Sequence, residues 1–245
     1  MKINAKGLDY RQLNELIHQQ SAAGAKNIIL DNVNGQRYIG TGLSNHDLKI
    51  TVKGVPGNDL AAFMDGPAIA VSANAQDGIA DTMNAGKIVI HGDAGDIAGH
   101  SMRGGKVYIK GDAGYRAGIH MKSYKQLHPV IIIGGSAGDF LGEYMAGGLI
   151  IVLGLNKEKN EPLVGNYCAT GMHGGAIYIR GEVEQWQLGQ EVKVFATDQT
   201  DQVILKKYLQ EYCRDFKIDL KQITSRKFTK LVPHTTRPYG KIYAY

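Results

Sequence analysis

The sequence predicts an all-β fold, a right-handed parallel β-helix of about seven coils with helical caps at both ends. Three observations lead to this prediction: a recurring methionine, apolar rows in the same register, and an excess of glycine. The methionines follow one another at intervals of 19, 19, 19, 24 and 27 residues, at Met64, Met83, Met102, Met121, Met145 and Met172. Glycine accounts for 32 of the 245 residues, whereas ordinary usage of roughly 7% would give about 17. A repeat of 19 residues, with insertions of 5 and 8 in two coils, therefore organises the chain.

Two rows of mostly β-branched residues keep this register and lie two positions apart. Alternate residues of a strand face the same side, so stacked coils would bury each row as a continuous ladder. The first row is Ile50, Ile69, Ile88, Val107, Ile131, Ile150 and Ile177. The second row is Val52, Val71, Ile90, Ile109, Ile133, Val152 and Ile179.

Small residues and a row of Asn and Asp follow the apolar rows in each coil. We expect glycine and Asn/Asp to provide positive-φ turns between the faces of the solenoid. The predicted structural turn glycines are Gly92, Gly95, Gly99, Gly111, Gly114, Gly118, Gly135, Gly138 and Gly142. The two insertions fall near 124–128 and 156–162, where polar residues and a proline predict surface loops.

Both ends of such a solenoid need a cover, because an open coil edge would pair with other strands. We expect residues 1–35 to form an N-terminal helix and strand cap, with Asp9 at the start of the helix. Residues 36–182 would form the repeat domain, and 183–245 a C-terminal helix over 201–216 followed by a basic extended arm.

The C-terminal part of the chain is basic. Residues 206–245 contain ten Lys and Arg against three acidic residues, whereas the whole chain has a net charge of +5. A basic segment can bind an acidic protein surface or nucleic acid, or simply be solvated. We expect the arm to dock on a partner through Arg237, Tyr239 and Tyr243, because tyrosine and arginine are typical interface anchors.

Composition gives a cellular expectation. Two cysteines provide no disulfide framework, the N-terminus lacks the apolar stretch of a signal peptide, and no run of about 18 apolar residues is present. We therefore expect a cytoplasmic protein.

The repeat resembles a known domain. The resemblance rests on the segments NVNGQRYIGTGL (32–43), IVIHGDAGDIAGHSMRGGKVYIKGDAGYRAGIHMKSY (88–124) and VIIIGGSAGDFLGEYMAGGLIIVLGLN (130–156). They are similar to the C-terminal β-helix domain, with its GXGXG motif, of the glutamate synthase large (alpha) subunit. The β-helix subunit of formylmethanofuran dehydrogenase has a similar repeat, although the quoted segments are nearer the synthase pattern.

The resemblance implies a role. In glutamate synthase this domain is a scaffold between an amidotransferase domain and an FMN-containing synthase domain. It therefore implies a non-catalytic structural subunit of a glutamate synthase-like complex, with a glutamine amidotransferase-type subunit and an FMN-containing synthase-type subunit as partners. FMN and an iron–sulfur cluster would belong to the partner, with no cofactor or metal in this chain. The product of the complex, its electron donor and its stoichiometry stay open.

Two other function classes remain as alternatives. Residues 134–138, Gly-Gly-Ser-Ala-Gly, match the Gly-x-Ser-x-Gly nucleophile elbow of hydrolases, which would make Ser136 the nucleophile of a stand-alone esterase. However, an elbow requires a following helix, whereas the next residues repeat the coil turn. The basic tail could instead form a nucleic-acid-binding module, although it lacks the aromatic interleaving of single-strand binders.

Overall fold

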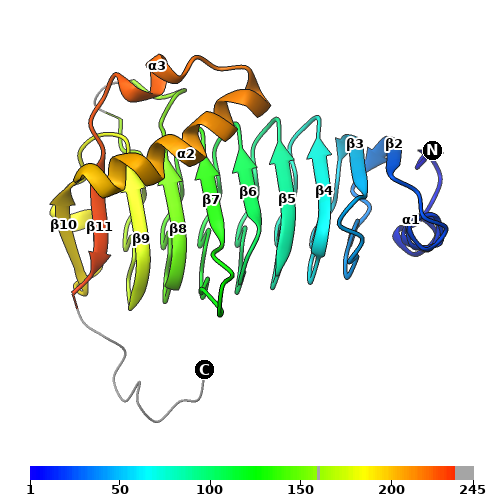
Figure 1. Cartoon of the computed structure of the whole chain (residues 1–245), viewed down its shortest axis with the longest axis horizontal. Helices are drawn as coiled ribbons and strands as arrows, with labels where there is room; N and C mark the ends of the chain where they lie inside the picture. Colours follow the sequence, from blue (N-terminus) through cyan, green and yellow to red (C-terminus); the bar gives the residue numbers. More distant parts are fainter. Residues whose placement is uncertain (159–160, 235–245) are drawn as a thin grey trace, which may run out of the picture.

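The computed structural model describes residues 1–158 and 161–234. One sheet of 11 strands runs the length of the molecule, in the order β1 to β9, then β11 and β10 (Figure 1). The strands are β1 Lys2–Asn4, β2 Asn27–Asn34, β3 Lys49–Val55, β4 Asp65–Val71, β5 Ala85–Ile90, β6 Lys106–Ile109, β7 Val130–Ile133, β8 Ala146–Val152, β9 Gly174–Ile179, β10 Val192–Ala196 and β11 Thr229–Pro233. The helices are α1 Tyr10–Ala22, α2 Gln199–Phe216, α3 Leu220–Thr224 and the short 3-10 helix η1 Gln185–Gln187. The chain therefore forms a parallel β-helix, as the repeat predicts.

The predicted register is confirmed at every coil. Strands β1 to β9 pair in parallel, and each member of the first apolar row lies beside the next, from Ile50 against Ile69 to Ile150 against Ile177. The second row pairs in the same way, from Val52 to Ile179. Both rows and all six repeat methionines are buried. At roughly 1.5–3 kcal/mol for each buried side chain, this stacked interior is the main source of stability.

A second line of contacts runs along another face of the solenoid. Successive alanines form parallel bridges from Ala75 through Ala94 and Ala113 to Ala137. Beside them, each Asn or Asp side chain accepts a hydrogen bond from the equivalent backbone N–H one coil further on. Asn74 thus accepts from Asp93, at 2.9 Å, and Asp93 accepts from Asp112, also at 2.9 Å.

This arrangement corrects our expectation for the Asn/Asp row. Asp77, Asp96 and Asp139 do not have positive φ; the residue after each of them does, namely Gly78, Ile97 and Phe140. The physical reason is that these carboxylates are engaged with the following coil, as in the 2.9 Å bond from Asp96 N–H to Asp77 Oδ1.

The N-terminal cap forms as predicted. Asp9 accepts hydrogen bonds from the N–H groups of Arg11 and Gln12, and the Gln12 side chain accepts one from Asp9 N–H, a reciprocal capping box. Leu13 and Ile17 are buried against the first coil. Strand β2 already pairs in parallel with β3, so the sheet extends into the first 35 residues.

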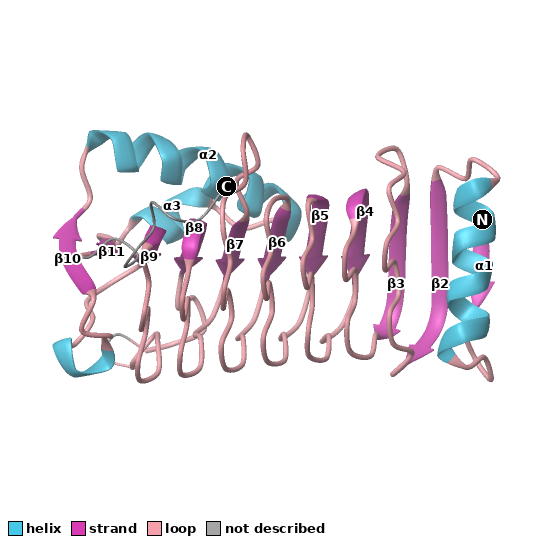
Figure 2. Ribbon diagram, turned by 90° about the horizontal axis from the view of Figure 1, so that it is seen from below, coloured by secondary structure: helices cyan, strands magenta, loops and turns pink. Residues whose placement is uncertain are grey.

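The C-terminal helix lies along the flank of the sheet. Figure 2 shows α2 and α3 beside the strands, with α1 at one end of the row and β10 at the other. The reason is the composition of the outward strand face, where Ile132 and Ile151 are apolar and pack with Leu209 and Tyr212 of α2. The end of the solenoid is covered by β11 and β10, which add antiparallel strands after β9. Within the described residues, no helix combines the length and apolarity required to cross a bilayer.

Candidate partner-binding surface

One corner of the solenoid has an unusual backbone. In each coil, every second residue of the segment before the methionine has positive φ, as at Phe140, Gly142 and Tyr144. The N–H groups of these three residues are all hydrogen-bonded: Phe140 and Tyr144 donate to the next coil, at 2.8 and 2.9 Å, and Gly142 donates to the previous coil, at 2.8 Å. The corner is therefore fixed by hydrogen bonds to both neighbouring coils.

Large side chains occupy these strained positions in the later coils. Arg116, His120, Phe140, Tyr144 and Tyr167 have φ between 52° and 62°. Left-handed conformations cost a non-glycine residue roughly 1 kcal/mol or more, whereas glycine adopts them freely. Local strain of this kind concentrates at functional sites. We name this surface the aromatic corner, defined by Arg116, His120, Phe140, Glu143, Tyr144 and Tyr167.

The side chains of the aromatic corner hold one another in place. The rings of Phe140 and Tyr167 stack with centroids 5.1 Å apart, and the Arg116 guanidinium lies 4.5 Å from the Phe140 centroid. Arg116 Nε donates to Glu143 Oε2 at 3.0 Å. Tyr144 stacks on His120 and is 46% exposed, and Tyr167 is 57% exposed. Pre-ordered, exposed tyrosine and arginine are typical of residues that dominate protein interfaces.

A hydrogen-bonded line of Asp81, His100 and Ser101 lies at the same corner in the preceding coils, where the His100 ring is 6.0 Å from the His120 ring. His100 Nδ1 is 3.0 Å from Asp81 Oδ1, and Ser101 Oγ is 3.3 Å from His100 Nε2. This order of groups resembles a catalytic triad. However, the N–H groups of His100 and Ser101 donate to Ile97 and Ile119 carbonyls, at 3.1 and 2.9 Å. Neither N–H is free to stabilise an oxyanion, so the line serves to connect coils.

The structure gives Ser136 a place in the side-chain ladder. Its N–H and Oγ both donate to Asp112 Oδ1, at 2.7 and 3.0 Å. A bridge and a turn follow it, not the helix that a nucleophile elbow requires. Burial alone would raise the pKa of Asp112, but hydrogen bonds from Ser136 and Asn156 outweigh that effect and lower it. Ser136 therefore terminates a run of Asn and Asp as their structural equivalent.

The predicted turn glycines fall into two groups. Gly99, Gly118 and Gly142 have positive φ, as expected. Five of the other six are required by close approach: a Cβ on Gly111, for example, would collide with Oδ1 of Asp93 in the previous coil. The same collision with a side-chain oxygen of the previous coil occurs at Gly92, Gly95, Gly114 and Gly135, whereas a Cβ on Gly138 would lie 3.0 Å from its nearest neighbours, a tight contact that small shifts relieve.

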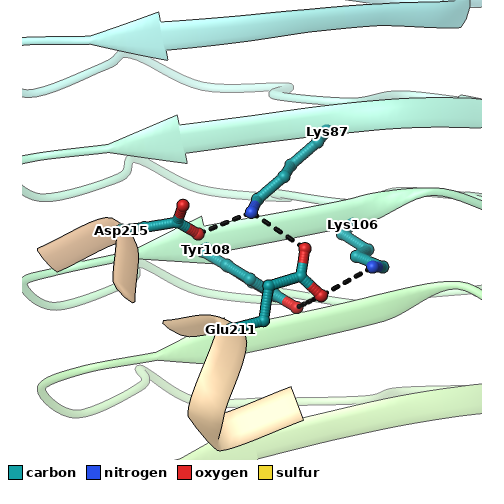
Figure 3. Close-up of polar contacts among 5 residues, drawn as sticks. All are labelled: Lys87, Lys106, Tyr108, Glu211 and Asp215. Carbon is teal, nitrogen blue, oxygen red and sulfur yellow. Dashed lines mark hydrogen bonds and ion pairs between the residues drawn. The ribbon is translucent and has the colours of Figure 1, made fainter. Parts of the chain in front are cut away.

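An ionic cluster attaches α2 to the solenoid (Figure 3). Glu211 accepts from Lys106 at 2.6 Å, Lys87 at 2.9 Å and the Tyr108 hydroxyl at 3.2 Å. Lys87 also pairs with Asp215 at 2.6 Å. Burial alone would raise the pKa of Glu211, but hydrogen bonds from the two lysines prevail and lower it to about 2. Burial, together with the Glu211 charge, raises the pKa of Tyr108.

A second buried group joins the start of α2 to β9 and β11. Asp201, 2% exposed, accepts from the Tyr178 hydroxyl at 2.5 Å and from Lys230 at 2.7 Å. These bonds outweigh burial and lower the pKa of Asp201. The helix is thus attached at both ends, and its other face stays in solvent.

Sequence reasoning missed the aromatic corner. A signal was available in the aligned repeat: Arg116, Phe140 and Tyr167 occupy the position of Gly78 in an earlier coil.

The predicted docking residues Arg237, Tyr239 and Tyr243 lie outside the described residues. Within 1–158 and 161–234, no group of three His, Cys, Asp or Glu is placed to hold a metal.

Comparisons with known proteins agree with the fold. The sequence profile of the GXGXG motif matches residues 21–237. An uncharacterized protein of Methanocaldococcus jannaschii is 48% identical over 248 residues, covering 98% of this chain and 95% of that protein. A chain in the crystal structure of the formyltransferase/hydrolase complex from Methylorubrum extorquens, bound to methylofuran, has a similar fold. Its TM-score is 0.63 at 19% identity, with 95% of each chain covered.

Proposed function

The chain belongs to the GXGXG motif family, and we propose that it is a non-catalytic structural subunit of a multi-subunit enzyme complex. The observation that carries this proposal is the aromatic corner. Large, exposed and mutually stacked side chains occupy backbone positions that favour glycine, so they reduce stability without serving the core. A protein interface accounts for that cost, because such anchors concentrate binding energy.

The chemistry of the described residues supports a structural role. The apolar rows and the methionines fill the interior of the solenoid. The two serine-containing arrays each include a bond between coils, from His100 to Asp81 in the first and from Ser136 to Asp112 in the second. The similar fold of a chain from the formyltransferase/hydrolase complex also supports a place in an assembly.

We further propose that the partners are a glutamine amidotransferase-type subunit and an FMN-containing synthase-type subunit. The support is the resemblance of 88–124 and 130–156 to the glutamate synthase domain. FMN and the iron–sulfur cluster would reside in the synthase-type subunit, and this chain would hold no cofactor. Its place would be between the two catalytic subunits.

A second candidate assembly has a different chemistry. The fold of this chain also resembles that of a chain from a formyltransferase/hydrolase complex, which supports an assembly of that type. The scaffold role would be the same in both assemblies, and the partner subunits would differ.

Purification from the organism's own cells tests this proposal. A tagged copy of the chain, expressed at its natural level, should co-purify with amidotransferase-type and synthase-type subunits in constant ratio, measured by mass spectrometry. Formyltransferase-type and hydrolase-type subunits would select the second assembly. A chain that elutes alone from size exclusion, at natural expression, would overturn the scaffold role.

A further inference from the structure

The outer surface of α2 and α3 is mostly basic, whereas most of the acidic residues of these helices lie on their inner surface. Its acidic residues face inward or cap helices: Asp201 and Glu211 are paired with lysines, and Asp219 caps α3 through Lys221 N–H at 3.0 Å. The basic side chains that remain in solvent are Lys206, Lys207, Arg214, Lys217, Lys221 and Lys227. This face therefore has a strong positive potential.

A groove with an apolar floor lies within this positive surface. It has a volume of about 630 Å³ and runs between α2, α3 and the segment that leads to β11. Leu205 and Leu209 of α2, with Leu220 and Phe228, provide the apolar part of its lining. Lys206, Arg226 and Lys227 provide its cations. The groove thus combines a site for an apolar side chain with cations around it.

We propose that this groove, which we call the α2–α3 groove, binds an acidic segment of a partner protein with an apolar residue flanked by carboxylates. The inference rests on the proposed function, because it assigns a partner's chemistry to a structural subunit. The apolar side chain would contact Leu209 and Phe228, and the carboxylates would pair with Lys206 and Lys227. Such charges accelerate association and set specificity, and the apolar anchor provides the burial.

The lining favours a protein over a nucleic acid. Single-stranded nucleic acids bind through aromatic side chains that stack on successive bases, whereas Phe228 is the one aromatic residue that lines this groove. Leucine side chains instead match an aliphatic or aromatic anchor of a peptide.

A binding measurement with defined probes tests the groove directly. The probes are a fluorescent peptide that alternates glutamate and leucine, its lysine–leucine counterpart, and a single-stranded DNA. In fluorescence anisotropy, the full chain should bind the glutamate–leucine peptide in preference to both others. The double variant Lys206→Glu, Lys227→Glu should bind it about tenfold more weakly.

A matched control separates this site from general charge. Lys26→Glu, Lys49→Glu makes the same change in net charge on exposed lysines near the N-terminal cap, and should bind as wild type. Equal losses in both double variants, or preference for the DNA, would overturn the proposal. All four lysines are exposed and are not paired with the acids named above, so we expect neither double variant to change the melting temperature. Equal melting temperatures then show that a difference in binding does not come from unfolding.

Assembly in cells distinguishes the two levels of the proposal. If the tagged wild type and the Lys26/Lys49 variant retain the partner subunits and the Lys206/Lys227 variant loses them, the groove is the docking site. If all three retain them, this inference fails and the scaffold role stands. If the wild type retains none, the scaffold role fails. The peptide measurement alone then shows whether the α2–α3 groove binds an acidic segment.

Discussion

The coils and the C-terminal helical unit are stabilised in different ways. In the strands from β3 to β9, the residues of the two apolar rows lie beside their equivalents one coil away, so one set of contacts recurs along the solenoid. The unit of α2, α3, β10 and β11 is attached by contacts that occur once. Glu211 reaches Lys87 and Lys106, which are 124 and 105 residues away in the sequence.

This difference shows that a repeat fills the interior of the solenoid but does not cover its outward flank. Repetition fills the interior, because every coil contributes the same apolar pair to two neighbours. The outward flank at β7 and β8 is apolar through Ile132 and Ile151, and only a segment from outside the repeat covers it. Damage to a coil should therefore affect the whole solenoid, whereas damage to the α2 contacts should be local.

The largest effect should come from a charge in the central apolar row. Ile109 is fully buried between Ile90 and Ile133. Ile109→Asp should destabilise the protein by about 4 kcal/mol or more, because the carboxylate has no partner there. Tyr124, 40% exposed in an insertion, is the control; Tyr124→Asp should change the unfolding free energy by about 0.5 kcal/mol or less. Equal melting temperatures for the two variants would contradict the described core.

Gly111→Ala should be the next most damaging change. Its Cβ would collide with Asp93 Oδ1, and overpacking of this kind costs about 1–3 kcal/mol. Asp93→Ala removes the colliding oxygen and loses one hydrogen bond, from Asp112 N–H. The double variant should therefore be more stable than the sum of the two single changes by about 1 kcal/mol, as measured by urea denaturation. Strict additivity would show that the two coils do not interact through this pair.

Glu211→Gln should weaken the attachment of α2 by about 1–2 kcal/mol, an intermediate value because Glu211 is only partly buried. The pKa of Glu211 is lowered from 4.5 to about 2. The stabilisation is therefore complete above the unfolded-state value of 4.5 and is lost as the pH falls toward 2.

Hydrogen exchange and thermal melting measure this effect. Amides of α2 should exchange faster in the variant than in the wild type near neutral pH, while β3–β6 stay protected. Between about pH 6 and about pH 3, the variant should lose less stability than the wild type. A larger pH-dependent loss in the variant would contradict the assigned sign.

Tyr167→Ala should have the smallest effect on stability. Tyr167 is exposed and has φ of 57°. We therefore expect the unfolding free energy, measured by thermal melting, to change by about 0.5 kcal/mol or less. The same variant should retain less of the partner subunits in pull-downs, whereas Tyr124→Ala should retain them fully. Full retention by both variants would remove the aromatic corner from the interface.

The solenoid could be predicted from the sequence because its determinants recur. In a single coil, Ile88 and Ile90 do not by themselves identify a buried strand. Seven aligned coils with Ile or Val at the same two positions do identify one, and the strand register predicted from them is the observed register. The N-terminal helix was also predictable, since Asp9 and Gln12 form a local capping box. The domain boundaries at 35 and 182 stay predictions.

The aromatic corner and the position of α2 could not be predicted in the same way. Left-handed φ at Phe140 and Tyr144 is imposed by hydrogen bonds to adjacent coils, and no local propensity indicates it. The helix over 201–216 was predicted, but its position depends on single contacts such as Glu211 with Lys106. Contacts that occur once leave no periodic signal.

The pairing of Asp93 with Gly111 has a consequence for how such proteins change in length during evolution. Asp93 requires a glycine 18 residues later and an N–H donor 19 residues later, whereas Asp112, which is followed by an insertion, has them 23 and 24 residues later. Removing residues 92–110 would leave this relation intact, because Gly111 would take the place of Gly92 beneath Asn74. Removing a few residues more or fewer would place a side chain against that oxygen. Insertions such as 124–128 lengthen the chain within a coil and leave the pairing in place. The solenoid itself can therefore lengthen or shorten only in whole coils, each about 4.8 Å, so the span between two bound subunits changes in discrete steps.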